Sequence, residues 1–307
     1  MKTIKAAATL FMTGVMLLTS GCVQKVLNGI RGGNKEYDSI VEKWKDGNTF
    51  EGEAADDAIG ALFAAAEAKD HDEFKECFIE SIRSKSNFDG KIDDFMDAFP
   101  KGMSEAELTY VGGGAGGSVD YDNFEKGASY NYNCTVKGEW YYVSVSFCFC
   151  NDKHPENIGV EQFLIMNLNA RAYHTDKASR DEYYYDYFDI LCDIKSEEEM
   201  PARLINGCPY LWTETDTPKL SEDQMRDLLY EYGTLGNKEV REKIGDCNAY
   251  YKAFNSTGYT HFYELKPVNG EPRYAKIICQ VDYGKIYDAY VCTPDDADYD
   301  NPLYERD

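Results

Sequence analysis

The sequence predicts an α+β protein in which helices precede an antiparallel sheet, and in which this order occurs twice. Apolar residues recur at intervals of three and four between residues 53 and 99, the spacing of amphipathic helices. Between residues 130 and 168 they alternate instead, as in half-buried strands. Helices followed by strands favour helices packed on one face of a curved sheet. The 307 residues exceed what one core usually organises, so we expect two domains.

The first 22 residues have the layout of a bacterial export signal. Lys2 and Lys5 form a basic start, and a mostly apolar run extends over residues 6–19. The run is too short, and too often interrupted by Gly and Thr, to make a comfortable membrane span. Leu18-Thr19-Ser20-Gly21 then precedes Cys22, and this resembles a lipobox, the motif whose cysteine is lipidated. We therefore expect a lipid-anchored protein; the alternative is a secreted protein that is cut nearby.

Three helices are expected before residue 100. Asp70 and Glu73 have the spacing of a capping box at the start of the second helix. Pro100 ends the third helix, because proline disfavours a helical residue before it. The apolar stripes of the three helices are, in order, Ile59, Leu62, Phe63 and Ala66; Phe74, Cys77, Phe78 and Ile82; and Ile92, Phe95, Met96 and Phe99.

Three antiparallel strands are expected next, over residues 130–136, 140–150 and 158–168. Lys137-Gly138 forms a tight turn between the first two strands. One face of the second strand carries Tyr141, Val143, Val145, Phe147 and Phe149, and the other carries Ser144, Ser146, Cys148 and Cys150.

The run from Gly112 to Gly117 is expected to be a flexible loop before these strands. A phosphate-binding loop would continue with Lys and Ser or Thr and then a helix. Here Ser118-Val119-Asp120 follows and no cation is present, so the flank would repel phosphate.

The second half repeats the order of elements. Ser221 and Gln224 start a helix, strands begin at His261, and Asn269-Gly270 forms a hairpin turn. A further helix between them carries Val240, Ile244, Cys247 and Tyr251. The expected organisation is a signal peptide (1–21), a lipidated cysteine and tether (22–52), a first domain (53–170), a Tyr- and acid-rich connector (171–190), a second α+β domain (191–293) and an acidic tail (294–307).

Residues 54–170 resemble a family of Gram-positive lipoproteins, a domain of unknown function with a nuclear-transport-factor-2-like, or cystatin-like, fold. The resemblance rests on the helix pair through Phe78, on Asn87-Phe88-Asp89, on the Gly-rich turn and Tyr-containing strand, and on Pro155-Glu156-Asn157-Ile158-Gly159. It implies a cone-shaped sheet wrapped around helices, whose concave mouth often holds a small ligand. The family has no established activity, so the resemblance implies no catalytic residue.

Composition excludes several classes of function. The formal net charge of −23 argues against binding to the phosphate backbone of a nucleic acid. The apolar content of 43% and the aromatic content of 14% predict a packed core rather than a disordered acidic chain. Apart from Cys22 there are nine cysteines, an odd number that leaves at least one unpaired. Many thiols in an exported protein suggest an anaerobic bacterium.

The segment 181–189 combines aromatic rings with carboxylates. Its tyrosines are Tyr183, Tyr184, Tyr185 and Tyr187. Rings stacked on sugar faces, with acids bonded to hydroxyls, would make a glycan-binding surface. The alternative is an interdomain segment that buries some rings and keeps their hydroxyls wet.

The C-terminal tail carries the only pattern that suggests a metal. Asp296, Asp298 and Asp300 occupy positions 1, 3 and 5 of a calcium-loop pattern, and Asp307 occupies position 12. The bidentate Glu and the following helix of that motif are missing, so an acidic tail without metal is the alternative. We expect no other cofactor.

These observations predict a lipoprotein anchored at the extracytoplasmic side of the membrane, acting as a non-catalytic module that binds a small molecule, a glycan or a protein. The rival hypothesis is an isomerase- or dehydratase-like enzyme that uses buried Asp, Tyr or His inside the cone for acid–base chemistry. His174, near Arg171 and Asp176, is one candidate for this role, but we expect it to be a solvent-exposed histidine in the connector. A polar pocket in the interior of the first domain would favour the enzyme, and an interior filled by Phe and Met would oppose it.

Overall fold

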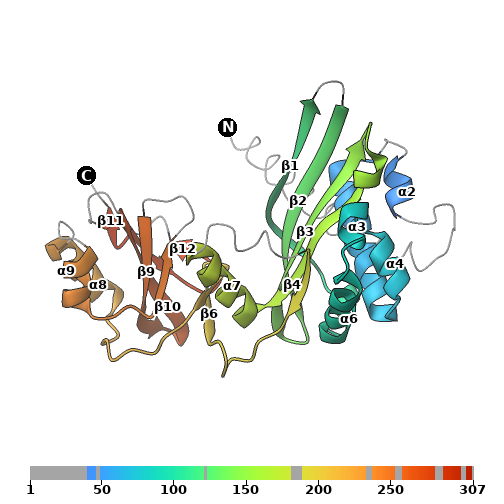
Figure 1. Cartoon of the computed structure of the whole chain (residues 1–307). Helices are drawn as coiled ribbons and strands as arrows, with labels where there is room; N and C mark the ends of the chain where they lie inside the picture. Colours follow the sequence, from blue (N-terminus) through green and yellow to red (C-terminus); the bar gives the residue numbers. More distant parts are fainter. Residues whose placement is uncertain are drawn as a thin grey trace, which may run out of the picture. The chain divides into compact units, whose positions relative to one another are not determined.

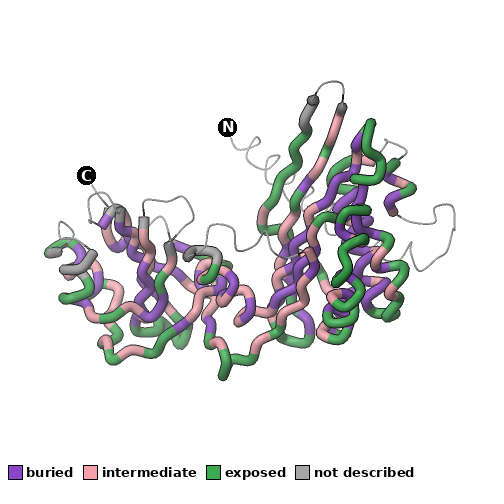
Figure 2. Tube along the Cα trace, viewed as in Figure 1, coloured by how far each residue is buried: buried purple, intermediate pink, exposed green. Residues whose placement is uncertain are grey.

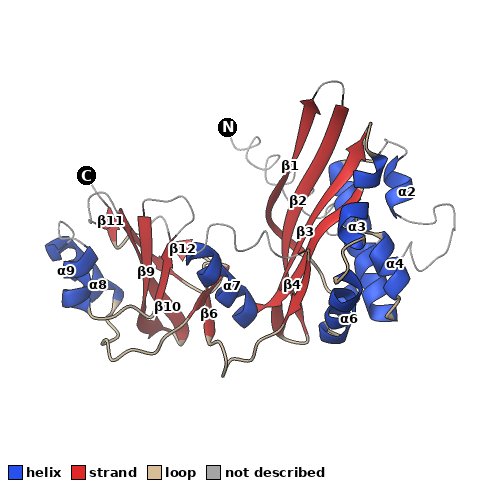
Figure 3. Cartoon of the chain, in the orientation of Figure 1, coloured by secondary structure: helices blue, strands red, loops and turns tan. Residues whose placement is uncertain are grey.

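The computed structural model describes residues 40–45, 49–120, 123–180, 189–232, 237–252, 258–280, 286–298 and 302–305. The chain has the expected α+β class, with helices and mostly antiparallel sheets (Figures 1 and 3). It divides into two compact units, each with its own buried apolar residues. Unit 1 comprises Met1–Asn167 and Phe188–Asp193, and unit 2 comprises Leu168–Tyr187 and Ile194–Asp307.

Unit 1 contains a five-stranded sheet in the order β1-β2-β3-β4-β5. Neighbouring strands are antiparallel, except that β5 lies parallel to β4. Lys137 and Gly138 both have positive φ, as expected for the tight turn between β2 and β3. The strands are β1 (Thr109–Asp120), β2 (Asn123–Val136), β3 (Glu139–Asn151), β4 (Gly159–Asn167) and β5 (Ile190–Asp193).

The helices of unit 1 precede its strands, as predicted. Asp70 caps one of them by accepting a hydrogen bond from the Glu73 N–H at 3.1 Å. Helix α6 stops two residues before Pro100, in agreement with the predicted end. The helices are α2 (Ile40–Lys45), α3 (Glu51–Ala68), α4 (His71–Glu76), α5 (Glu80–Arg83) and α6 (Phe88–Ala98), with 3-10 turns at Met103–Glu105 and Pro155–Asn157. None of the described helices, in either unit, is long and apolar enough to cross a membrane.

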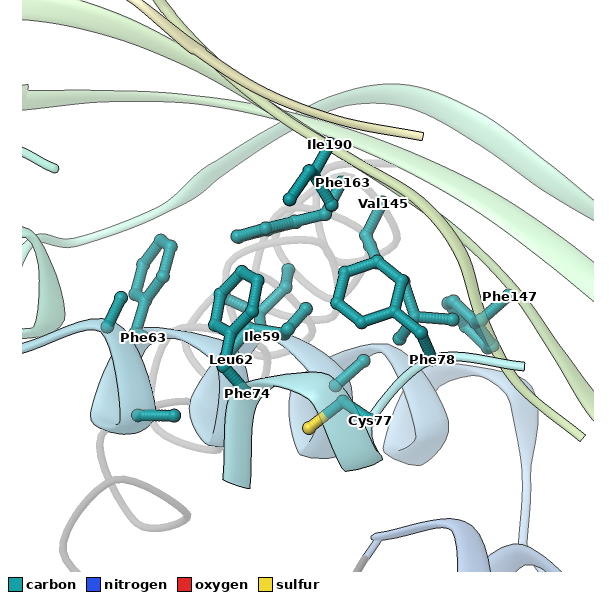
Figure 4. Packing of buried hydrophobic residues seen from close by; sticks show 14 of the residues in the cluster. Ile59, Leu62, Phe63, Phe74, Cys77, Phe78, Val145, Phe147, Phe163 and Ile190 are labelled. Atoms are coloured by element: carbon teal, nitrogen blue, oxygen red, sulfur yellow. The ribbon is translucent and has the colours of Figure 1, made fainter. Parts of the chain in front are cut away.

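The core of unit 1 lies between these helices and one face of the sheet (Figures 2 and 4). The predicted inner face of β3 is confirmed, since Val143, Val145 and Phe147 are fully buried there. Leu62 and Phe63 of α3, Phe74 of α4 and Phe78, which follows α4, point toward the sheet (Figure 4).

Two expectations for this region are wrong. Residues 112–117 form the middle of strand β1 rather than a flexible loop, because their backbone pairs residue by residue with β2. Much of the expected connector is also regular, since Leu168–Arg180 forms helix α7. That helix packs on strands of unit 2. This packing stabilises the helix, although the polar sequence of the segment does not predict one.

Unit 2 contains a six-stranded antiparallel sheet, in which β12-β11-β10-β9-β8 are neighbours and β13 also pairs with β11. A separate hairpin is formed by β6 and β7. Asn269 and Gly270 have positive φ, as expected for the predicted turn between β9 and β10. The strands are β6 (Ala202–Ile205), β7 (Cys208–Leu211), β8 (Ala249–Lys252), β9 (Gly258–Val268), β10 (Glu271–Gln280), β11 (Ile286–Cys292), β12 (Ala297–Asp298) and β13 (Tyr304–Glu305).

The two predicted helices of unit 2 are α8 (Glu222–Tyr232) and α9 (Asn237–Ile244). Ser221 and Gln224 form a reciprocal capping box, with N···O distances of 3.0 and 3.2 Å. Helix α9 is shorter than predicted, because Gly245 adopts φ +108° and the chain then enters β8. Cys247 and Tyr251 therefore lie beyond the helix that was expected to carry them.

Candidate ligand-binding site

The layer between helices and sheet in unit 1 is filled with aromatic side chains. The ring centroid of Phe95 lies 5.1 Å from that of Phe74 and 5.5 Å from that of Phe163. Phe78 packs in the same way against Phe88, at 5.1 Å. This apolar packing occupies the place where the enzyme hypothesis requires a polar acid–base pocket.

Three tyrosines gather on the neighbouring strands β1 and β2. Tyr130 and Tyr132 are two residues apart on β2, and Tyr110 is the β1 partner of Tyr132. The three ring centroids lie 5.9 to 6.4 Å from one another. The set runs from core to solvent, since Tyr132 is 8% exposed and Tyr110 is 54% exposed.

A glycine in β1, Gly113, lies opposite Tyr130, and the Tyr110 hydroxyl donates a hydrogen bond to the Gly113 carbonyl oxygen at 3.1 Å. Gly113 is the β1 partner of Tyr130, so β1 carries no side chain at that position. Gly113 adopts φ +138°, and a Cβ atom there would lie 2.1 Å from the Ser129 carbonyl oxygen. This close approach of β1 to β2 requires glycine.

Two carboxylates from α3, Glu51 and Asp56, act electrostatically on these tyrosines. Burial, followed by repulsion from Asp57 and Glu53, raises the pKa of Asp56 to about 6. Burial also raises the pKa of Tyr130, with further contributions from the charges of Glu51 and Asp56. We name Tyr110, Tyr130, Tyr132, Glu51 and Asp56 the tyrosine–carboxylate cluster.

A lysine near this cluster is bound to other acids. Lys43 on α2 lies 2.6 Å from an Asp57 oxygen and 2.9 Å from a Glu53 oxygen. Burial opposes its charge, but these two carboxylates raise the pKa of Lys43 overall. In the part of the chain that the structure describes, no cation forms an ion pair with Glu51 or Asp56. The cluster therefore presents aromatic rings beside uncompensated negative charge.

Most of the predicted site residues lie outside the described residues. These are Cys22, Tyr183, Tyr184, Tyr185, Tyr187, Asp300 and Asp307. Asp296 lies in the turn between β11 and β12, where its Oδ1 accepts a hydrogen bond from the Ala297 N–H at 2.7 Å. Asp298 belongs to β12 and pairs with Val291. Across the described ranges, no group of three or more His, Cys, Asp or Glu side chains is placed to hold a metal ion.

Unit 2 contains an open groove of about 760 Å³, lined by residues 213–218, Arg241 and residues 244–247. Arg241 donates a hydrogen bond to Asp246 at 2.6 Å. His261 is 2% exposed, and burial followed by the charge of Arg241 lowers its pKa to about 4. Its Nε2 has no hydrogen-bond partner among the described residues. His261 is therefore uncharged at neutral pH.

His174 corrects another expectation. We expected an exposed histidine in a connector, but His174 is 4% exposed on α7, with its ring 5.3 Å from that of Tyr173. Helix α7 packs on β6 and β7, which buries one of its faces. The expected exposure is wrong because the segment is a packed helix.

Sequence patterns predict only part of the tyrosine–carboxylate cluster. The alternation that predicts β2 also places Tyr130 and Tyr132 on one face of it. Glu51 and Asp56 are five residues apart, about 140° around a helix, so periodicity does not bring them together. The interpretation placed aromatic–acid chemistry at 181–189 because there the two residue types are adjacent in sequence.

Comparison with known proteins adds one match, which begins within α3 and ends at the first residue of α7. No curated protein and no solved structure matched the chain. The match contains the three tyrosines of the cluster and begins after Glu51 and Asp56. Residues 61–168 match the model of a family described as a domain of unknown function (DUF5104), which confirms that part of the expected resemblance.

Proposed function

We propose that this protein is a lipid-anchored extracytoplasmic binding protein, without catalysis of its own, that holds a cationic group at the tyrosine–carboxylate cluster. One observation carries the proposal: Asp56 is partly buried beside tyrosine rings and other acids, and no described cation neutralises it. Such a site gains from any ligand that brings a positive charge.

The chemistry of the cluster favours an organic ammonium or guanidinium group. Aromatic faces attract cations, by about 0.5 to 2 kcal/mol depending on how far the pair is desolvated. A cation beside Asp56 would also offset the repulsion that Asp57 and Glu53 exert on it. The aromatic rings and the Asp56 carboxylate both attract the positively charged end of the ligand. A cationic group surrounded by apolar carbon therefore fits best.

The phenols of the cluster support binding rather than proton transfer. Burial, followed by the charge of Asp56, raises the pKa of Tyr132, and burial raises that of Tyr130. Both hydroxyls therefore stay protonated at neutral pH and present ring faces and O–H groups to a ligand. The Phe-filled interior supports the same interpretation.

For the fold, we propose a nuclear-transport-factor-2-like cone of the kind found in Gram-positive lipoproteins. Helices α3, α4 and α6 all contribute to a single core against one face of the sheet, as such a cone requires (Figure 4). The tyrosine–carboxylate cluster would then lie at its mouth.

The ligand is tested by calorimetric titration of the full-length protein with arginine amide and with tetramethylammonium. We expect Asp56→Asn and Tyr110→Ala each to weaken binding about 10-fold, a loss of about 1.4 kcal/mol. Asp94→Asn removes the same charge from an exposed position on α6 and should leave affinity unchanged. Affinity should rise as pH increases through about 6, because Asp56 must ionise to attract the cation. Equal binding of neutral glucose, unaffected by Asp56→Asn, would contradict a cationic ligand.

The anchor is tested at Cys22 in cells. Two or more acyl chains give stable membrane attachment, so Cys22→Ala should move the protein from the membrane fraction to the soluble fraction. Mass spectrometry of the mature N-terminus should find acyl chains on Cys22. An unmodified Cys22 in membrane fractions would refute the anchor and leave the ligand site untouched.

A further inference from the structure

Strand β1 forms an edge of the sheet in unit 1. In the sheet order it has β2 on one side, and no other described strand pairs with it (Figure 1). The pairing with β2 extends over the full length of β1, which has 12 residues. About half of the backbone N–H and C=O groups of such a strand point away from its one neighbour.

Among the described residues, this edge has one feature that can protect an edge strand, a register shift between Tyr110 and Gly112, and it lacks the others. Natural edge strands carry lysine, proline or inward-pointing charges, or are short or covered. Between Thr109 and Val119, β1 contains no charged residue and no proline. Residues 109–117 are exposed, apart from the half-buried Gly112 (Figure 2). The outer backbone groups of β1 are therefore accessible to another chain.

The glycines of β1 have a second consequence. Glycine weakens a strand through backbone entropy and the lack of a side chain to pack, so pairing on one side stabilises this strand less than usual. Gly114 and Gly116 have no atom within 4 Å of the place where a Cβ would stand. An incoming strand would meet no side-chain obstacle there, and it would add a second set of ladder hydrogen bonds.

We propose that the free edge of β1 binds an extended peptide segment of a partner protein, added as a further antiparallel or parallel strand, and that a Lys or Arg of this peptide enters the tyrosine–carboxylate cluster. The second part rests on the proposed function. Tyr110 belongs both to β1 and to the cluster, so a peptide on this edge lies next to one ring of the cluster; the neighbouring ring, that of Tyr130, is subject to the charges of Glu51 and Asp56. Exposed Val111, 49% accessible, adds apolar contact next to Tyr110.

Charge decides between a basic peptide and a second copy of this chain. The chain carries a formal net charge of −23, so two copies repel one another, whereas a basic segment is attracted. The uncompensated carboxylates of the cluster act in the same direction. The added strand supplies backbone hydrogen bonds for affinity, and the cluster supplies selectivity for the cation.

The test uses the full-length protein in detergent and a peptide of about ten residues, with alternating valine and threonine and one central arginine. We expect it to bind about 10-fold or more tightly than arginine amide and to slow hydrogen exchange at the amides of residues 112–117. A control peptide with two valines replaced by proline keeps its charge but loses strand hydrogen bonds, and should bind no better than arginine amide.

Two matched proline variants distinguish the free edge of β1 from the edge that pairs with β2. Successive residues of a strand direct their N–H groups to opposite sides, so one of Gly116→Pro and Gly117→Pro removes an N–H from the free edge and the other removes one from the β2 pairing. The variant that keeps the wild-type melting temperature should lose the extra peptide affinity. Equal peptide affinity in both variants would overturn the proposal.

The remaining outcomes are distinct. A peptide no tighter than arginine amide, with unchanged exchange in β1, overturns the edge proposal and leaves the proposed function standing. If a peptide with threonine in place of arginine binds equally well and protects β1, the edge site holds and the cationic ligand is refuted. Sedimentation showing a dimer that the peptide dissociates would assign the edge to a second copy instead.

Discussion

Asp56 costs the folded protein stability, and this makes its role measurable. Its pKa is about 6 in the folded state and about 3.8 as an isolated group, so the folded state binds more protons between these values. Stability therefore falls as pH rises from about 4 to 6, and the cost is complete above that range. A carboxylate whose charge destabilises the folded protein is consistent with a site in which a ligand neutralises that charge.

We predict that Asp56→Asn stabilises the protein at pH 7.5 while it weakens ligand binding. The gain should be about 1 to 2 kcal/mol, since solvent screening reduces what this pKa shift would be worth in a fully buried site. Thermal unfolding at pH 7.5 and at pH 4 measures it, and the difference should vanish at pH 4, where both side chains are neutral. Asp94→Asn is the matched control. A destabilised variant at pH 7.5 would show that Asp56 has a structural partner.

His261 is predicted to make unit 2 sensitive to acid. Its folded pKa of about 4 lies below the ordinary value of 6.5, so the unfolded state binds more protons between these values. Stability present above pH 6.5 is lost as pH falls toward 4, by about 3 kcal/mol. Hydrogen exchange at the amides of β9 and β10 should show this loss, and His261→Gln should remove most of it. An equal loss in the variant would assign the acid sensitivity to other groups.

At the scale of elements, we expect the stability of β1 to depend more on Gly113 than on the neighbouring glycines. We predict that Gly113→Ala destabilises the protein by about 2 to 4 kcal/mol, because it combines a positive φ with a Cβ placed against the Ser129 carbonyl. Gly114→Ala, where a Cβ meets nothing within 4 Å, should be neutral or slightly stabilising. Thermal unfolding followed by circular dichroism compares the two. Equal effects would mean that β1 does not hold the register described here.

Elements with local signals were predictable, and elements that depend on partners were not. Ser221 with Gln224, and Asn269 with Gly270, are contiguous patterns whose chemistry is complete within a few residues. The glycine-rich part of β1 has a low intrinsic tendency to form a strand, and it becomes one only because β2 supplies a ladder. Helix α7 likewise owes its stability to packing on β6 and β7.

At the scale of the whole molecule, unit 1 is discontinuous in sequence. The chain leaves unit 1 after Asn167 and later returns to form β5. Asp189 is the residue directly before β5. The Asp189 carboxylate lies 2.7 Å from Lys85 Nζ and 2.9 Å from Lys91 Nζ. Burial opposes its charge, but these hydrogen bonds lower its pKa overall, so its stabilisation is present above about pH 4 and is lost as pH falls further.

We predict that Asp189→Asn lowers the free energy of unfolding of unit 1 by about 1 to 3 kcal/mol, because it leaves two lysines without their partly buried partner. Asp97→Asn breaks one exposed pair with Lys69 and should cost clearly less stability than Asp189→Asn does. Urea unfolding measures both variants at pH 7. Equal costs would show that Asp189 does not anchor β5.

The sequence by itself determined the fold class, the order of helices and strands, the main turns and the inner face of β3, because hydrophobic periodicity and turn chemistry act over a few neighbouring residues. Tertiary structure decided which polar residues meet. Tyr110, Tyr130 and Asp56 come from two strands and a helix, and only the closing of the helix layer onto the sheet brings them together. The burial that raises the pKa of Asp56 exists only after that closure, so no local pattern could announce the site.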